Sequence, residues 1–488
     1  MEMNRLKESG LRIKVILAHD NKFGIGKDNQ LPWMLKSELK NFRDITSHTN
    51  TPLVKNVIIM GRKTWESLPV KPLPTRMNVV ISGTITEARG ATVFKSLPEA
   101  LTELGKSSLV NKNNIFIIGG EMLFTEAINS PLCEKAYITE IYKTFDCDKK
   151  FQKLPDNFKI TNVSKIKEEN GIHYRYFTYS NKEYYGRDFK NEYIYENLEE
   201  KQYLDTLRNL IMLGQTRIDR TQVGTYSLFG IMHKYDLSRG FPLLTTKRMF
   251  VRGIFEELMF YLSGKTDNTI LTDKGIHVWD GNTTRDFLDK RGLTHLPEGD
   301  LGETYGFNFR HFGGTYKDCK TEYPESCGFD QVANAINLIR HNPASRRIII
   351  DIWNGATQDN AALPPCLCKY QFYVNDEEKK LDLMIYLRSS DFFLANNWNV
   401  ATGSFLVHLI CNLTGIDLNP GTLTAVMADT HLYQNHIEQA RTNLQRETRP
   451  YPILKIKEKK DNIMDFTYDD LELIGYKPHP NIKATMAV

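Results

Sequence analysis

The stretch Val57-Ile58-Ile59-Met60-Gly61-Arg62-Lys63-Thr64-Trp65-Glu66 decides the fold of the first half of the chain. Its apolar residues 57–60 predict a buried strand, and the residues after Gly61 predict a helix that begins at once. The first backbone N–H groups of such a helix point at the turn, where Arg62 and Lys63 add positive charge. The stretch therefore predicts an α/β sheet with a phosphate-binding turn at a strand end.

Short apolar strands alternate with helical stretches over residues 13–180. Strands are predicted at residues 13–18, 57–60, 78–82, 115–118 and 137–141, and a closing aromatic strand at residues 173–179. The stretch Ile117-Ile118-Gly119-Gly120-Glu121 repeats the strand-to-helix turn. Gly-Gly after a strand is commonly only a turn, but two such turns in one domain indicate a ligand with more than one phosphate.

A carboxylate stands on the apolar side of a predicted helix near the N-terminus. The segment Ile25-Gly26-Lys27-Asp28-Asn29-Gln30-Leu31-Pro32-Trp33 leads into a helix that carries Glu38, with Phe42 one turn later on the same face. A carboxylate there is costly unless it meets a hydrogen-bond partner or a cationic heterocycle. Glu38 therefore binds a ligand or is solvated, and spacing alone favours the solvated position.

Length and composition indicate a globular protein of two or three domains. The chain has 488 residues, 41% of them hydrophobic and 25% charged, and a formal net charge of +4. This small charge excludes a coat for genomic nucleic acid. Seven cysteines without Cys-x-x-Cys spacing indicate neither a disulfide framework nor a metal site. Without an apolar signal or membrane-spanning run, we expect a reducing, cytoplasmic location.

The chain divides into two unrelated halves. We expect one domain over residues 1–180, a short packed junction over residues 181–198, and a second domain over residues 199–488. In the second half, helices are predicted at residues 199–213, 252–262 and 399–413, and strands at residues 347–353 and 381–387. The expected fold class is thus α/β and α+β, with a mixed sheet flanked by helices in the first half.

Cys366 is the strongest nucleophile candidate. It follows Leu363-Pro364-Pro365 and shares the second half with Arg346, Arg347 and Arg388. A thiol reacts as thiolate, and nearby guanidinium groups lower its pKa while matching the geometry of a phosphate. A lone cysteine is more often an inert core residue. The arginines favour covalent chemistry on a phosphorylated substrate.

Other residues of the second half supply the remaining parts of such a site. Glu257 and Tyr305 are candidates to organise a proton-carrying water. His431 and Tyr433, two apart on a predicted strand, point the same way toward a sugar hydroxyl. Taken singly, most of these residues have a structural alternative. Glu257 could be a solvated helix residue, and His431 could be a core histidine with its hydrogen bonds satisfied. Arg220, another candidate for the phosphate, could form a surface ion pair.

The first half resembles dihydrofolate reductase. The motifs that carry the resemblance are Leu31-Pro32-Trp33, Glu38, Gly61-Arg62-Lys63-Thr64-Trp65, Pro72-Leu73-Pro74-Thr75-Arg76 and Ile118-Gly119-Gly120. The resemblance implies that Glu38, supported by Thr139, holds the pterin and assists its protonation while NADPH delivers hydride. Arg76 would take the folate carboxylate. The folate slot would be walled by Ala18, Leu31, Phe42 and Leu68, and the NADPH track lined by Ala18, Ile25, Gly26, Gly61, Arg62, Lys63, Thr64, Ser82, Gly119 and Gly120.

The second half resembles thymidylate synthase from residue 199 onward. The motifs are Asp219-Arg220-Thr221, Phe241-Pro242-Leu243-Leu244-Thr245-Thr246-Lys247-Arg248, Pro364-Pro365-Cys366, Arg388-Ser389-Ser390-Asp391, Asp429-Thr430-His431-Leu432-Tyr433 and the terminal Ile482-Lys483-Ala484-Thr485-Met486-Ala487-Val488. The resemblance implies methylation of dUMP to dTMP with 5,10-methylenetetrahydrofolate, with Cys366 attacking the uracil ring. Glu257, Tyr305 and Asn399 would complete the catalytic set, and the amide of Asn399 suits uracil.

The same resemblance implies a dUMP site built by two subunits. Arg346 and Arg347 would reach the phosphate of the partner subunit, so the homodimer, formed through this domain, would be obligatory for activity. The dUMP-binding set would be Arg220, Arg346, Arg347, Arg388, Ser389, Asp391, Asn399, His431 and Tyr433.

Some positions depart from the two family patterns. Phe124 stands where a tyrosine is common, and Ser82-Gly83 lacks a frequent arginine, so preference for NADPH over NADH rests on Arg62 and Lys63. Leu367 follows Cys366 where histidine is frequent, and Asn396-Asn397-Trp398 replaces the common Gly-x-Pro-Phe before Asn399. The departures in the second half predict slower turnover at most.

The chain is therefore interpreted as a fusion of the two enzymes, whose second half oxidises folate to dihydrofolate and whose first half reduces it again. Two alternatives stay open: a pseudoenzyme that binds folate or nucleotide for regulation, and an enzyme with one activity. The intact Cys366, Glu257 and Glu38 speak against the first, and separate substitutions at the two sites would decide the second.

Overall fold

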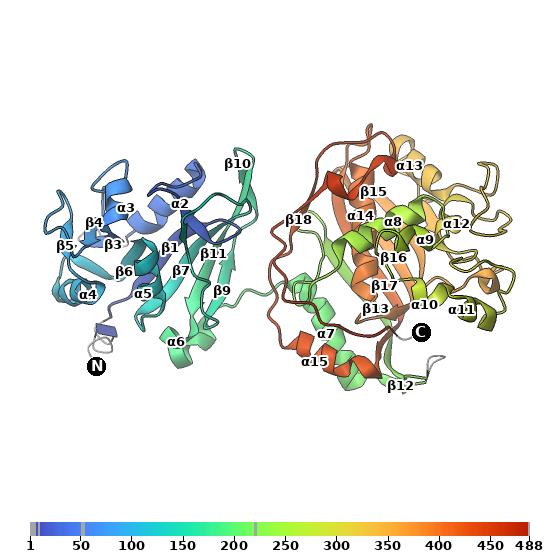
Figure 1. The fold of residues 1–488 in the computed structure, drawn as a ribbon, viewed down its shortest axis with the longest axis horizontal. Coiled ribbons are helices and arrows are strands. Elements are labelled where there is room, and N and C mark those ends of the chain that lie inside the picture. The colour runs from blue at the N-terminus through green and yellow to red at the C-terminus, as the bar shows by residue number, and fades with distance from the viewer. Residues whose placement is uncertain (1–5, 8–9, 50–53, 219–221, 487–488) are drawn as a thin grey trace. The chain divides into compact units, whose positions relative to one another are not determined.

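The computed structural model describes residues 6–7, 10–49, 54–218 and 222–486. Its contacts divide the chain into two compact units, residues 1–195 and 196–488 (Figure 1). The expected junction, residues 181–198, contains α6 (Lys182–Tyr185) and η1 (Gly186–Asn191), which belong to the N-terminal unit. The finer boundaries at residues 180 and 199 remain a prediction.

A nine-stranded mixed sheet forms the N-terminal unit. Its strands are β1 (Ile13–His19), β3 (Lys55–Gly61), β4 (Met77–Ile81), β5 (Thr92–Phe94), β6 (Val110–Gly119), β7 (Cys133–Ile141), β9 (Phe158–Val163), β10 (Lys167–Glu169) and β11 (Ile172–Asn181). They follow the order β10-β11-β7-β1-β6-β3-β4-β5, with β9 also paired to β11. The strands from β7 to β5 run parallel, so their carboxyl ends share one edge of the sheet.

Helices cover both faces of this sheet. On one face, α4 (Leu97–Lys106) and α5 (Glu121–Ile128) pack on Ile13, Val15 and Leu17 of β1. On the other face, α2 (Lys36–Ser47) and α3 (Arg62–Ser67) pack around Ile16. The alternation of β1 side chains between the two faces follows from the period of a strand. A second, two-stranded sheet joins β2 (Gly24–Gly26) to β8 (Lys149–Lys150).

The C-terminal unit is built on a six-stranded sheet in the order β12-β13-β17-β16-β15-β14. The strands are β12 (Gln215–Arg217), β13 (Thr225–Asp236), β14 (Ile349–Asp351), β15 (Leu367–Asn375), β16 (Lys380–Asp391) and β17 (Asn419–Tyr433), and a separate pair joins β18 (Ile453–Ile456) and β19 (Leu471–Ile474). Its helices include α7 (Leu198–Leu213), α8 (Val251–Leu262), α9 (Thr269–Thr272), α10 (Asp280–Thr283), α11 (Arg285–Lys290), α12 (Tyr305–Arg310), α13 (Gln331–His341), α14 (Asn396–Cys411) and α15 (Ile437–Leu444).

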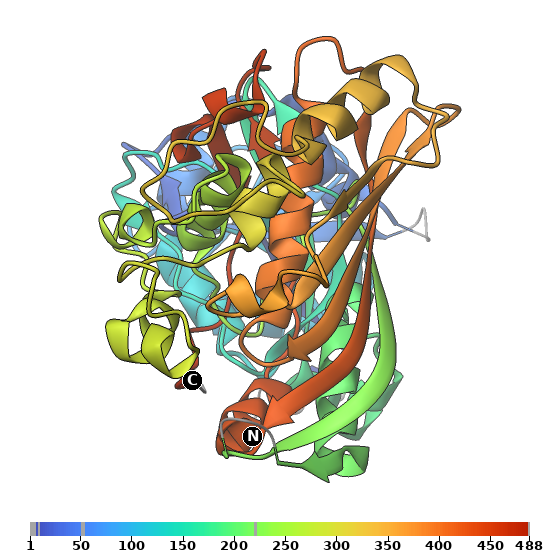
Figure 2. The same cartoon turned by 90° about the vertical axis from the view of Figure 1, so that its right-hand side faces the viewer.

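The helix α14 is the centre of this second core. It is apolar on nearly all sides and buried from Val400 to Cys411, as expected for a helix enclosed by its own unit. Figure 2 shows it running along one face of the sheet. There it meets the inward-facing Leu383 and Ile385 of β16.

The opposite face of the sheet exposes large apolar side chains. Met232 of β13 pairs with Val426 of β17, which pairs in turn with Tyr386 of β16. Met232 is 58% exposed, Tyr386 41%, and the neighbouring Met384 46%. This row is called the open sheet face below. Exposed apolar surface of this extent is typical of an interaction site.

Most predicted elements are confirmed, with differences at their ends. The strand predicted at residues 347–353 is shorter, because only Ile349–Asp351 pairs with β15. The helix predicted at residues 399–413 begins at Asn396 and ends at Cys411. All seven cysteines are free. Within the described part of the chain, no helix meets the length and apolarity that a membrane span requires.

Candidate active sites

Glu38 lies in the first turn of α2 and is buried, with 7% of its surface exposed. The expectation from spacing alone, that Glu38 is solvated, is therefore wrong. Burial raises the pKa of Glu38 to about 7, while the hydroxyl of Thr139 on β7, which donates to Oε1 at 3.4 Å, opposes that rise. A carboxyl group with this pKa holds its proton near neutral pH and can release it to a ligand.

One face of α2 extends from Glu38 toward a buried arginine. Phe42 and Thr46 follow Glu38 at spacings of four residues, which places all of them on one side of the helix. The Arg76 guanidinium donates from Nη1 to Thr46 Oγ1 at 2.7 Å and from Nε to the Pro74 carbonyl at 3.0 Å. No described carboxylate pairs with Arg76, although only 6% of it is exposed. A buried guanidinium without a counter-ion is suited to an anionic ligand.

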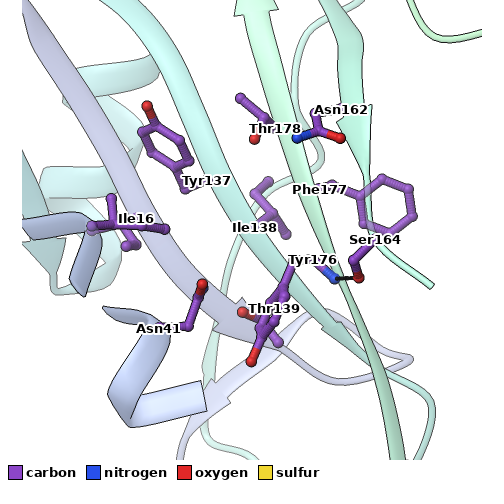
Figure 3. Close-up of a pocket in the computed structure, with 11 residues that line it drawn as sticks. Ile16, Asn41, Tyr137, Ile138, Thr139, Asn162, Ser164, Tyr176, Phe177 and Thr178 are labelled. Carbon is purple, nitrogen blue, oxygen red and sulfur yellow. Dashed lines mark hydrogen bonds between the residues drawn. The ribbon is translucent and has the colours of Figure 1, made fainter. Parts of the chain in front are cut away.

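A hollow of about 240 Å³ adjoins the Glu38–Thr139 pair (Figure 3). It lies between α2 and the strands β1, β7, β9 and β11, and its lining includes Thr139, Asn41 and Tyr176. The Tyr176 hydroxyl donates to the Ser37 carbonyl at 3.2 Å, one residue before Glu38. The hollow therefore brings polar groups close to the first turn of α2.

The expected cofactor residues gather at the carboxyl edge of the parallel strands. Gly61 ends β3, and Gly119 ends the neighbouring β6, where it lies opposite Met60. Ser82 follows β4, whose Ile81 pairs with Gly61. A Cβ atom at Gly119, where φ is 152°, would lie 2.8 Å from Thr64 Oγ1. Only glycine fits so close to α3 at this position. Because Gly119 has no side chain, a ligand can approach the backbone of the turn.

The other predicted residues of this half occupy three surroundings. Arg62 pairs with Glu66 at 2.8 Å, whereas Lys63 is exposed and has no partner among the described residues. Ile25 and Gly26 lie on β2, apart from the main sheet. The remaining wall residues are partly buried apart from the exposed Leu31; they are Ala18, Leu31, Phe42 and Leu68.

In the C-terminal unit, Cys366, Tyr305 and Arg388 share one junction. The backbone N–H of Cys366 donates to the Tyr305 hydroxyl at 3.0 Å. The Cys366 carbonyl accepts from the N–H of Arg388 at 2.9 Å. The Arg388 guanidinium also donates to the carbonyls of Pro365 at 2.9 Å and Pro364 at 2.8 Å. These bonds place the backbone of Cys366 beside Arg388 within one chain, and the pairing of the thiol itself with an arginine stays a prediction.

Glu257 lies beside this junction, separated from it by aromatic rings. It is buried on α8, so the solvated position that was its structural alternative is excluded. The Trp279 indole donates to Oε1 at 2.9 Å, and the Trp398 indole donates to Oε2 at 2.6 Å. Burial raises the pKa of Glu257, and hydrogen bonds from Trp398, Tyr261 and Trp279 oppose that rise. Tyr261 stacks on Tyr305, with ring centroids 4.7 Å apart.

A further group lies at the ends of β16 and β17. Asp391 pairs in register with His431, and Ser389 pairs with Asp429. The rings of His431 and Tyr433 meet at 5.3 Å, so they lie on one side of the strand as predicted. Asn399 lies in the first turn of α14 and donates to the Ala395 carbonyl at 3.1 Å.

Arg346 and Arg347 are not brought to Cys366 by any contact within the chain. Both are exposed, and among the described residues neither guanidinium has a hydrogen-bond or ion-pair partner. They immediately precede the edge strand β14 at one side of the sheet. Arg220, predicted to bind phosphate, lies outside the described residues.

Sequence reasoning missed the indole donors. Trp279 was not singled out, and Trp398 was noted only as a departure from a pattern. The available signal was its position directly before Asn399 on a predicted helix. The direction of an indole N–H depends on tertiary packing, so the sequence did not reveal its partner.

Comparisons with known proteins identify the family of each half. Residues 12–181 match the family model for dihydrofolate reductase, and residues 201–488 match that for thymidylate synthase. The chain is 41% identical over 478 residues to the bifunctional dihydrofolate reductase-thymidylate synthase of Paramecium tetraurelia, covering 97% of this chain and 98% of the relative. Its identity to the Zea mays protein of the same name is 38% over 508 residues, covering 97% and 96%. The chain is 36% identical over 503 residues to the protein of the same name from Leishmania major, and the match covers 97% of this chain and 95% of that relative.

Proposed function

Because this chain belongs to the bifunctional dihydrofolate reductase-thymidylate synthase family, we propose that Cys366 and Glu38 are the residues that carry its two reactions. The chain methylates dUMP to dTMP and reduces dihydrofolate to tetrahydrofolate. What remains to be assigned is the role of each side chain. The seven free cysteines support the further proposal of a reducing, cytoplasmic location.

Cys366 is the nucleophile of dTMP synthesis in this proposal. Its thiolate adds to carbon 6 of the uracil ring, which makes carbon 5 nucleophilic enough to take the one-carbon unit of 5,10-methylenetetrahydrofolate. The bond from its N–H to Tyr305 and the bonds of Arg388 to the preceding prolines hold the thiol-bearing turn in place. Arg388 keeps Nη1 available for the dUMP phosphate.

Glu257 organises the proton transfers of the same reaction. Its carboxylate is fixed by two indoles and lies one aromatic layer from Tyr305. Asn399 reads the pyrimidine edge, since an amide offers both a donor and an acceptor. The residues proposed to complete the nucleotide site are Arg220, Ser389, Asp391, His431 and Tyr433.

We infer that the active form is a homodimer joined through the open sheet face. The exposed Met232, Met384 and Tyr386 supply an apolar surface, and Arg346 and Arg347 precede β14 at the edge of the same sheet. In the dimer each pair of arginines serves the phosphate of the partner subunit. Two unpaired guanidinium groups support this role, because they have no counter-ion among the described residues of their own chain.

Glu38 is the acid of dihydrofolate reduction. Its carboxyl group, oriented by Thr139, holds the pterin and assists protonation of nitrogen 5. Arg76 binds the folate carboxylate at the far end of the same helix face, and Ala18, Leu31, Phe42 and Leu68 enclose the ring system.

NADPH is the proposed reductant, and it supplies the hydride when bound. The carboxyl edge of the parallel strands fits its phosphates, since Gly61, Gly119 and Gly120 line the turns there and a side chain at Gly119 would collide with Thr64. A Cβ atom at Gly83, beside Ser82, would meet no atom within 4 Å. Lys63, which has no partner among the described residues, is the proposed cation for the 2′-phosphate, with Arg62 beside it. Ile25 and Gly26 are proposed to close over the cofactor.

The observation that carries the proposal is the junction of Cys366, Tyr305 and Arg388 in one unit and the buried Glu38–Thr139 pair in the other. Separate substitutions of the nucleophile Cys366 and the acid Glu38 should each remove only one of the two activities. Cys366→Ala should abolish dTMP formation and leave NADPH oxidation with dihydrofolate intact, and Glu38→Ala should do the reverse. Loss of both activities in either variant would contradict two independent sites.

A binding protein without catalysis is tested directly by mass spectrometry. The intact chain, mixed with 5-fluoro-dUMP and methylenetetrahydrofolate, should gain the mass of both compounds, and Cys366→Ala should not. An unchanged mass of the intact chain would favour the non-catalytic alternative.

A further inference from the structure

Glu257 is held by two indoles that come from different parts of the fold. Trp279 precedes α10, and Trp398 lies in the first turn of α14. Each carboxylate oxygen accepts one indole N–H, Oε1 from Trp279 at 2.9 Å and Oε2 from Trp398 at 2.6 Å. The second bond is as short as a charge-assisted hydrogen bond to a carboxylate.

No cation in the described part of the chain compensates the charge of this carboxylate. Among the described residues, Glu257 forms no ion pair with lysine, arginine or histidine. The titratable groups around it are Tyr261 on its own helix, Tyr305 on α12, Tyr370 on β15 and, beyond Tyr305, Cys366. Each of these would repel a carboxylate if it were ionised. The indole N–H groups and the Tyr261 hydroxyl are therefore what stabilises the ionised form in this buried position.

We propose that Trp398 is a positioning residue for dTMP synthesis, whose indole N–H keeps the Glu257 side chain ionised and fixed in orientation. The inference rests on the proposed role of Glu257 in proton transfer. A phenylalanine ring at this position would fill similar space but offer no N–H donor.

Trp398 has a packing contact in addition to its hydrogen bond. The far edge of the Trp398 ring lies close to Gly253, where an added Cβ atom would come within 3.1 Å of it. Phe250 lies against the same glycine and has no bond to Glu257. Trp398 and Phe250 thus both pack against Gly253, but only Trp398 donates a hydrogen bond to Glu257. Phe250 therefore serves as a control for the packing contact.

The test is the pH dependence of kcat for dTMP formation in Trp398→Phe. Loss of a hydrogen bond to a charged group lowers kcat about ten-fold at pH 7. Because the lost donor favoured the ionised form, the acid limb of the profile should move to higher pH, and the rate should recover in alkaline buffer. KM for dUMP should change less than two-fold. Phe250→Leu should keep the wild-type profile.

An isosteric variant separates the hydrogen bond from the ring. Replacing Trp398 by benzothienylalanine, in which sulfur stands for the indole N–H, should reproduce the profile of Trp398→Phe. A wild-type profile in the benzothienylalanine variant, or a loss in Trp398→Phe that is equal at every pH, would overturn the inference. Dihydrofolate reduction by the same chains should stay unchanged.

Glu257→Gln distinguishes this inference from the proposed function. Full activity of Glu257→Gln would contradict the role of Glu257 itself. Strong impairment of Glu257→Gln together with a wild-type profile for Trp398→Phe would contradict only the role of Trp398.

Discussion

Glu38 and Glu257 are buried acids on helices, and the number of their hydrogen-bond donors separates their roles. Glu38 accepts one hydroxyl at 3.4 Å, and its pKa is raised to about 7. Glu257 accepts an indole on each oxygen, and those donors oppose the effect of burial on its pKa. The first environment suits a proton donor, and the second suits a carboxylate that organises water.

The raised pKa of Glu38 predicts that its unit loses stability as the pH rises. The pKa is about 7 in the folded state against 4.5 for a free side chain. The contribution of Glu38 to stability is therefore fully present below pH 4.5 and is lost as the pH rises through 7. Between pH 5 and pH 8 the wild type should lose about 2 kcal/mol of unfolding free energy relative to Glu38→Gln.

Hydrogen exchange of the β1 and β7 amides, corrected for intrinsic rates, measures this difference within the N-terminal unit alone. Amides of the C-terminal unit serve as the internal reference. An equal pH dependence of exchange in the two proteins would show that Glu38 is not the titrating group.

Among the elements, the strands were the most predictable and the site contacts the least. Runs such as residues 57–60 and 115–118 are dense in β-branched residues, and they form the buried β3 and β6. The burial of Glu38 was not predictable from helix spacing, because it depends on β7, whose Thr139 lies 101 residues further along the chain. The junction at Cys366 was predicted in part, since its link to Arg388 arises from the pairing of β15 with β16.

One buried carboxylate joins α7 to the loop that precedes α8. Glu200 is completely buried, and its Oε1 accepts from the N–H groups of Thr245 at 2.9 Å and Thr246 at 2.8 Å and from the Thr246 hydroxyl at 2.8 Å. Its Oε2 accepts from the Thr245 hydroxyl at 2.5 Å. The sequence does not indicate these four hydrogen bonds, because Glu200 stands in an ordinary helical pattern. Its effect is to fix the segment that carries Lys247.

Graded substitutions of Glu200 should reveal this connection. Glu200→Gln retains an oxygen that can accept the three bonds of Oε1, so it should cost about 1 kcal/mol. Glu200→Ala leaves buried N–H groups without acceptors and should cost about 3 kcal/mol. Hydrogen exchange of residues 241–249 should be fastest in Glu200→Ala, intermediate in Glu200→Gln and unchanged in the exposed control Glu196→Gln. Identical exchange in all three variants would contradict the structural role of Glu200.

At the scale of the whole molecule, each unit has its own core and its own site. The buried clusters of residues 11–158 and of residues 203–466 do not mix. This division explains why the two activities should respond to separate substitutions. The proposed homodimer was expected only from the family resemblance; the strand patterns do not indicate it, because the strands of the open sheet face alternate like any half-exposed sheet.

The dimer proposal predicts that two inactive variants restore dTMP synthesis when their subunits exchange. Cys366→Ala lacks the nucleophile, and the double variant Arg346→Ala, Arg347→Ala lacks the phosphate ligands for its partner. In a mixed dimer, the double-variant subunit keeps Cys366 and receives intact arginines from the other subunit, so one of its two sites is complete. Random exchange makes about half of the dimers mixed, and about a quarter of the wild-type dTMP activity should return.

Tyr386→Lys, placed in both variants, should prevent recovery by charging the open sheet face, while dihydrofolate reduction persists. If the arginines served their own chain, no mixture would recover activity, because every subunit with Cys366 would lack its arginines.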